Sequence, residues 1–107
     1  MSTDTIRHEG TLWVWQGDGP AAWHFVTVDG DAGLQLAALE AMRRLETGAR
    51  RGFGSVKVSA RIGDSTWATS VFPHKTSGGW LLPVRAAIRK AEDIAEGDRV
   101  QITLQVV

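Results

Sequence analysis

The segment VKVSARIGDSTWATSVF, residues 56–72, has the pattern of a β-hairpin. Apolar side chains occupy every second position from Val56 to Ile62, which is typical of a strand with one buried face. Gly63 and Asp64 then form a tight-turn signal, and residues 66–72 are expected to pair back as a second strand. The middle of the chain therefore predicts an antiparallel strand pair.

The sequence after this hairpin predicts a short strand, a helix and a closing strand. A polar loop over residues 74–79 leads to a buried strand at residues 80–82. Pro83 suits the first turn of a helix, where its missing N–H is not needed, and an apolar stripe from Val84 to Ala91 continues that helix. Apolar residues alternate again from Val100 to Val106, so we expect a half-buried last strand.

The sequence before the hairpin predicts two strands and a longer helix. Residues 12–15 and 23–28 are expected to pair around a Gly- and Pro-containing turn. Residues 34–46 then change to helical periodicity, and Asp31 is placed to cap that helix. The apolar positions at helical spacing are Leu34, Ala38, Ala41 and Leu45.

The order of these elements contains a weak internal repeat. An apolar strand, a helix and a second strand occur over about residues 23–62 and again over about residues 80–106, with Val26 corresponding to Leu81. We expect one domain over residues 11–107, preceded by a loose N-terminal tail over residues 1–10. The fold class is mainly β with two helices.

Composition narrows the classes of function. The 107 residues are 43% hydrophobic and 22% charged with no net charge, which is typical of a globular domain and gives no bulk attraction to nucleic acid. The chain has no cysteine, so disulfides, thiol catalysis and thiolate metal sites are excluded. No uncharged stretch approaches the length of a membrane span, and we expect a cytoplasmic protein. There are five tryptophans and no tyrosine, and the sequence leaves open whether Trp13 and Trp15 face the core or a partner.

Two family resemblances follow from ordered motifs. Residues 82–104, LPVRAAIRKAEDIAEGDRVQITL, resemble the strand–helix–strand unit of the AbrB/MazE-type swapped-hairpin proteins. Residues 12–107 more closely resemble the bacterial domain-of-unknown-function family nineteen-oh-five. The motifs that carry this second resemblance are WHFVTV at 23–28, the Val-rich strand before Gly63, Trp67, Ser70, Pro73, GGWLLP at 78–83, Arg85 with Arg89, and Gly97–Asp98.

The closer resemblance implies a six-stranded, closed double-split β-barrel capped by helices, whose halves are related by a pseudo-two-fold axis. It implies no established activity. DNA-binding AbrB-type proteins are dimers that present basic loops, whereas this chain carries both halves itself.

The motif search finds no cofactor, metal or catalytic signature. GDGPAA at residues 17–22 matches a dinucleotide pattern, but a proline and a strand stand where the helix belongs. His8, His24 and His74 show no metal-ligand spacing, and no nucleophile motif is present. We therefore assign no catalytic residue, metal or cofactor.

The preferred hypothesis is a non-enzymatic binding module for an anionic or aromatic small molecule, or for a protein partner. Arg85 and Arg89 are one helical turn apart and can hold a carboxylate or phosphate with planar guanidinium groups. Trp67 and Trp80 are candidate aromatic walls. The candidate ligand-binding residues are Arg85, Arg89, His74, Lys75, Trp80 and Trp67.

Two alternatives stay open. Residues 41–63 hold six basic residues and one acidic residue, which favours nucleic-acid binding through Arg43, Arg44, Arg50, Arg51 and Lys57. The zero net charge counts against this alternative. The second alternative is a small enzyme that uses His74 or His24 as a general base in a Trp-lined barrel. We expect a monomer or weak dimer, with no membrane partner.

Overall fold

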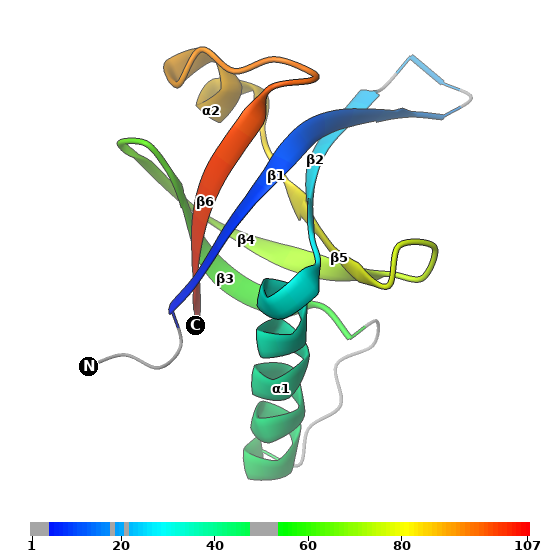
Figure 1. The fold of residues 1–107 in the computed structure, drawn as a ribbon, viewed down its shortest axis with the longest axis vertical. Helices are drawn as coiled ribbons and strands as arrows, with labels where there is room; N and C mark the ends of the chain where they lie inside the picture. Colours follow the sequence, from blue (N-terminus) through cyan, green and yellow to red (C-terminus); the bar gives the residue numbers. More distant parts are fainter. Residues whose placement is uncertain (1–4, 18, 21, 48–53) are drawn as a thin grey trace.

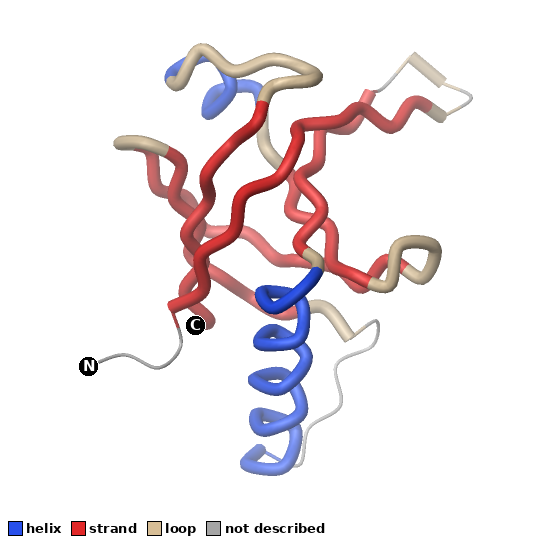
Figure 2. Tube along the Cα trace, viewed as in Figure 1, coloured by secondary structure: helices blue, strands red, loops and turns tan. Residues whose placement is uncertain are grey.

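The computed structural model describes residues 5–17, 19–20, 22–47 and 54–107. Within them, six strands close into an antiparallel barrel in the order β1-β2-β5-β4-β3-β6, with a helix at each end (Figures 1 and 2). The elements are β1 (Thr5–Gln16), β2 (Ala22–Val28), α1 (Gly30–Thr47), β3 (Val56–Ile62), β4 (Ser65–His74), β5 (Gly79–Pro83), α2 (Ala86–Ala91) and β6 (Arg99–Val106). The mainly β fold class with a closed barrel and two helices is thus confirmed.

Two long strands each change partner part-way along their length. β1 pairs with β6 as far as Thr11 and with β2 from Leu12 onward. β4 pairs with β3 as far as Val71 and with β5 from Phe72 onward. Each long strand therefore passes from one sheet into the other, which closes the barrel and leaves no sheet edge along its wall.

The pairing order has an internal two-fold symmetry. If β1 is exchanged with β4, β2 with β5 and β3 with β6, every strand keeps the same two neighbours. Each repeat therefore has three strands: the first is β1, β2 and β3, and the second is β4, β5 and β6. The predicted repeats lacked the first strand of each set, β1 and β4. The predicted correspondence of Val26 with Leu81 is wrong. Val26, Trp80 and Leu82 face the core, whereas Leu81 lines an outer hollow. A strand has a side-chain period of two, so an odd offset would exchange its inner and outer faces.

Residues 5–10 form the first half of β1, so the expected loose tail is wrong for this segment. The predicted residues 1–4 of that tail lie outside the described part of the chain. Ile6 and Gly10 are buried, and β6 satisfies the backbone over this stretch. The mixed polar sequence hides the strand, because only every second side chain points into the barrel.

The predicted apolar face of α1 is also wrong. Ala32 and Leu36 are buried against the barrel, whereas Leu34 is 71% exposed and Leu45 is 86% exposed. Figure 1 shows that the later part of α1 extends away from the strands, which explains the exposure of Leu45. Leu34 lies in the part that contacts the barrel, but it projects from the side opposite to Ala32 and Leu36. Asp31 lies inside the first turn and not at the cap, because the helix begins at Gly30.

α2 is shorter and begins later than predicted. Pro83 ends β5 and does not open the helix, and Arg85 occupies the position before the first helical residue. Ile88 is the buried side chain of α2 and packs into the core with Val84. No described helix has the length and apolar character needed to cross a membrane.

β5 and α1 meet at a tight contact that closes one end of the barrel. The Trp80 indole N–H donates to the Gly33 carbonyl oxygen at 3.2 Å, and the Trp80 side chain is 8% exposed. Gly79 lies so close to β2 that a Cβ there would be 2.6 Å from the Val28 carbonyl oxygen. A glycine is therefore required at this position for steric reasons.

Candidate functional site

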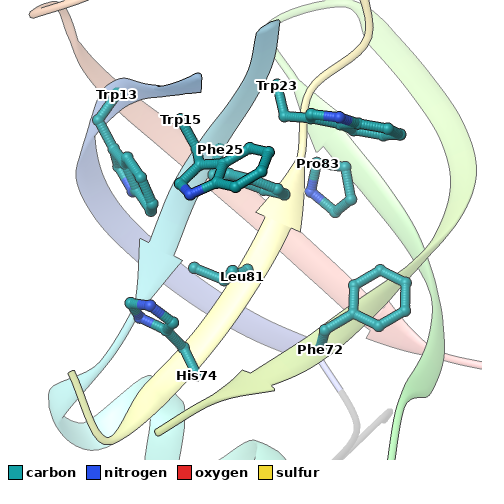
Figure 3. Close-up of a pocket in the computed structure, with 8 residues that line it drawn as sticks. All are labelled: Trp13, Trp15, Trp23, Phe25, Phe72, His74, Leu81 and Pro83. Atoms are coloured by element: carbon teal, nitrogen blue, oxygen red, sulfur yellow. The ribbon is translucent and has the colours of Figure 1, made fainter. Parts of the chain in front are cut away.

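The outer side of the sheet formed by β1, β2, β5 and β4 carries a hollow of about 460 Å³. We call this surface the aromatic face. Figure 3 shows its side chains projecting from the four strands on one side of the sheet. The lining residues are Trp13, Trp15, Trp23, Phe25, Phe72, His74, Leu81 and Pro83.

The strand register explains why these rings gather. Trp13 lies opposite Phe25, and Trp15 lies opposite Trp23, in the β1–β2 pair. Directly opposed residues of an antiparallel pair project to the same face of the sheet, so each of these two pairs places two aromatic side chains next to each other on that face. β5 continues the face, because Pro83 is opposite Phe25.

The rings form a connected row across the strands. Trp23 and Phe25 are nearly parallel, with ring centroids 6.5 Å apart and an angle of 10° between the planes. Phe25 and Trp13 are tilted at 5.4 Å, and Trp13 and His74 are tilted at 6.2 Å. The Trp13 indole N–H donates to the Thr27 hydroxyl at 2.8 Å, which holds one ring of the row in place.

The other end of the row is open to solvent. Trp15 is 51% exposed, Trp23 is 53% exposed and Phe72 is 41% exposed. Exposed apolar residues scattered singly are ordinary, but three large ones around one hollow are typical of an interaction site. The aromatic face therefore combines a fixed part, at Trp13 and Phe25, with an accessible part.

A second hollow, of about 420 Å³, adjoins the aromatic face, and we call it the arginine hollow. Its characteristic residues are His24, Trp67, Arg85 and Arg89, and it shares Trp23, Phe72 and Pro83 with the aromatic face.

The two guanidinium groups of the arginine hollow bind neutral acceptors. Arg85 Nη2 donates to the Ala68 carbonyl oxygen at 3.2 Å, and Arg89 Nε donates to the Val84 carbonyl oxygen at 3.2 Å. Arg89 Nη1 lies 3.2 Å from His24 Nε2. Within the described residues, neither arginine forms an ion pair with a carboxylate.

These contacts favour the neutral form of the His24 imidazole. A guanidinium can only donate, so His24 Nε2 accepts and the proton of the neutral imidazole is on Nδ1. That Nδ1 is buried and has no partner among the described residues. Burial lowers the pKa of His24 and the Arg89 charge lowers it further, while Glu96 acts in the opposite direction.

The sequence matches the model of one family, described as "Domain of unknown function (DUF1905)", over residues 9–104. The chain belongs to the DUF1905 family. No curated protein matches it.

The residues predicted to form one ligand site in the DUF1905 domain lie in two separate hollows. Arg85, Arg89 and Trp67 line the arginine hollow. His74, Lys75 and Trp80 line a third hollow, beside α1, and His74 also lines the aromatic face. The division arises because the β4–β5 loop and Arg85 lie at opposite ends of β5, which runs from Gly79 to Pro83.

The two tryptophans predicted as ligand walls belong to the packed core of the DUF1905 domain. Trp67 is 7% exposed, and its side chain joins the inward-facing residues of the barrel. Trp80 is buried as well and is bonded to α1 through its indole N–H. Both side chains are packed in the core, although Trp67 borders the arginine hollow and Trp80 borders the third hollow.

Three basic residues of the nucleic-acid alternative are described by the structure: Arg43 and Arg44 lie on α1, and Lys57 lies on β3. Arg44 forms an ion pair with Glu40 at 2.6 Å on α1, and the Arg43 guanidinium donates to the Val107 carbonyl oxygen. Lys57 is exposed on β3. Arg50 and Arg51 lie outside the described residues.

His74 has a structural role in the turn between β4 and β5. Its Nδ1 is 2.8 Å from the Ser77 hydroxyl, which also accepts the Gly79 backbone N–H at 3.2 Å. Within the described part of the chain, no three His, Asp or Glu residues form a cluster that could hold a metal ion.

Most of the aromatic face was missed by reasoning from the sequence. Trp13, Trp15, Trp23, Phe25 and Phe72 were not among the candidate binding residues. A usable signal was present: large aromatic residues at alternate positions of two paired strands must share a face. The sequence did not show which face was outside, because aliphatic residues occupy the alternate positions as well.

Proposed function

We propose that this DUF1905 domain is a non-enzymatic binding module that receives a planar, largely apolar ring of a small molecule on its aromatic face. The observation that carries this proposal is the exposure of Trp15, Trp23 and Phe72 around one hollow. Water-exposed rings on a folded sheet gain free energy when a ligand covers them.

Ring stacking gives the site its chemical preference. The near-parallel pair of Trp23 and Phe25 leaves flat apolar surface toward the hollow, and Pro83 adds a rigid edge. An aromatic pair contributes about 0.5–1.5 kcal/mol beyond the area it buries, so contact with two or three of these rings favours planar over saturated ligands. The site is complete within one chain, which supports a monomer or weak dimer as the binding form.

The test is a titration by two-dimensional NMR, in which the five indole N–H signals report on ligand contact. The probe is 2-naphthamide, and the control ligand is decahydro-2-naphthamide, which has the same skeleton without planarity. We expect saturable shifts of the Trp15 and Trp23 signals with the planar probe and weaker binding of the saturated one. The Trp15→Ala/Trp23→Ala variant should bind the planar probe at least about tenfold more weakly, because two ring contacts are lost.

Leu45→Ala is the matched control, since it removes an exposed apolar side chain from α1, away from the aromatic face. Flat titrations with the planar probe, or equal binding by the double tryptophan variant, would overturn the proposed function.

A different experiment distinguishes the nucleic-acid alternative from the proposed function, by comparing a variant of two basic residues with the tryptophan variant. Binding of a labelled single strand or duplex at low salt that is lost in Arg43→Gln/Lys57→Gln, and kept in the tryptophan variant, would establish that alternative instead. Such binding would weaken steeply with added salt.

A further inference from the structure

The aromatic face and the arginine hollow share a boundary. Trp23, Phe72 and Pro83 line both, so a ligand seated against these three residues has apolar rings on one side and guanidinium groups on the other. The aromatic rings come from β1, β2 and β4, Arg85 immediately precedes α2, and Arg89 lies within that helix.

The arginine side of this boundary carries uncompensated positive charge. Each guanidinium has five N–H donors. Arg85 uses one of them on a backbone carbonyl, and Arg89 uses two on a backbone carbonyl and a neutral imidazole. No ion pair within the described residues neutralises either group, and Glu96 acts on His24 without pairing with the arginines. Free donors beside an apolar hollow favour an anion over water, because a charge-assisted bond is strong where water is partly displaced.

We propose that the two hollows form one elongated site for a small aromatic carboxylate, with the ring on the aromatic face and the carboxylate at Arg85 and Arg89. The proposal rests on the proposed function and adds the anionic group of the ligand. A carboxylate is planar and matches the guanidinium fork, so two parallel N–H bonds can form from a single arginine. The shared residues at the boundary set a short separation between ring and charge.

The structure also explains why Arg85 is available. Its side chain is exposed, its single hydrogen bond to the described residues goes to the Ala68 carbonyl, and it precedes the first turn of α2. Arg89 is half-buried and held at two points, at Val84 and at His24. Arg85 can therefore move onto a ligand, while Arg89 provides a preorganised charge.

The experiment compares two probes that differ only in charge: 2-naphthoate and 2-naphthamide. Affinities are measured by the same indole N–H titration for wild type, Arg85→Gln, Arg85→Gln/Arg89→Gln and Lys90→Gln. Lys90 is an exposed cation on α2 outside the arginine hollow, so its replacement controls for the loss of general positive charge. Far-ultraviolet circular dichroism checks that each variant is folded.

We expect wild type and Lys90→Gln to bind 2-naphthoate about tenfold or more tightly than the amide, the size of one charged hydrogen bond. Arg85→Gln should reduce this preference and the double arginine variant should abolish it, because the affinity for the carboxylate falls much more than the affinity for the amide. If the double variant does not fold, the single Arg85→Gln variant decides, because it removes only one exposed contact.

Equal binding of the two probes by wild type would overturn the carboxylate site and leave the proposed function standing. A preference that survives in Arg85→Gln/Arg89→Gln, or one lost equally in Lys90→Gln, would also overturn the carboxylate site. Failure of both probes to bind would instead remove the proposed function itself.

Discussion

Replacing Trp80 by phenylalanine tests whether this residue is structural or lines a ligand site. The substitution removes the indole N–H that bonds to the Gly33 carbonyl at 3.2 Å, and it shrinks a side chain that is 8% exposed. The matched control is Trp23→Phe on the aromatic face, where the side chain is 53% exposed. Both variants make the same chemical change, and only the surroundings differ.

The expected cost follows from these surroundings. Loss of one intramolecular hydrogen bond costs about 0.5–1.5 kcal/mol of unfolding free energy. The space left by the deleted ring adds about 1–2 kcal/mol, because a packed core refills a cavity only partly. Trp80→Phe should therefore lower the unfolding free energy by about 1.5–3.5 kcal/mol. Trp23→Phe should change it by about 0.5 kcal/mol or less, as an exposed substitution does.

Urea denaturation followed by circular dichroism measures both values, provided that the slope with denaturant is the same in all three proteins. Thermal unfolding should agree, with a Tm about 10 °C lower for Trp80→Phe, given the size of the domain. A loss of unfolding free energy below about 0.5 kcal/mol for Trp80→Phe would refute the structural role, because surface substitutions that disturb no packing have effects of that size. An equal loss at Trp23 would refute the distinction between buried and exposed tryptophans.

Three further substitutions test other parts of the fold. Leu36→Ala should cost about 2–5 kcal/mol in the same denaturation experiment, and Leu45→Ala well under about 1 kcal/mol; the reverse order would show that α1 packs through its other face. Gly79→Ala should destabilise the domain, because its Cβ would lie 2.6 Å from a carbonyl oxygen of β2, whereas Gly19→Ala meets open space and should be neutral by the same measurement. Burial and, to a smaller extent, the charge of Arg89 lower the pKa of His24 in the folded protein. As the pH falls, His24 is therefore protonated more readily in the unfolded chain than in the folded one. The unfolding free energy should keep the full contribution of this residue above the usual histidine pKa of about 6.5 and decrease as the pH falls below it. His24→Gln should flatten that fall in melts between about pH 7.5 and 5, and an unchanged slope would contradict the assignment.

The strand positions were largely readable from the sequence, because half-buried strands alternate with a period of two. The hairpin around Gly63–Asp64 lies where the alternation predicts it, with Ile62 opposite Ser65. Alternation failed for β1, whose first half pairs with β6 although its sequence is mostly polar. There the partner strand, and not local hydrophobicity, stabilises the extended backbone.

The helices were less readable. Both helices were expected, but the face of α1 that packs on the barrel was not the one with the most regular apolar spacing. Leu34 and Leu45 satisfy that spacing and are exposed. Leu34 projects from the side of the first turns opposite to Ala32 and Leu36, and Leu45 lies where the helix has left the barrel. A helical periodicity reports that a face is apolar; it does not report how much of the helix has something to pack against.

The candidate site shows the same limit. Arg85 and Arg89 were recognised from their chemistry and spacing, and they do line a common hollow. Of the two predicted aromatic neighbours, Trp67 lines the same hollow and Trp80 lines another one, whereas Trp23, which comes from a distant strand, was not predicted.

By itself, the amino-acid sequence determined the family, the mainly β class, the approximate place of each strand and the absence of thiol chemistry. These properties depend on residue identity and on short-range periodicity, and both are visible along the chain. Only the tertiary structure decided which tryptophans are core and which form the aromatic face, and that this face shares a boundary with the arginine hollow. The reason is that each side of a strand acquires its surroundings from partners far away in sequence, through a register that alternation alone does not specify.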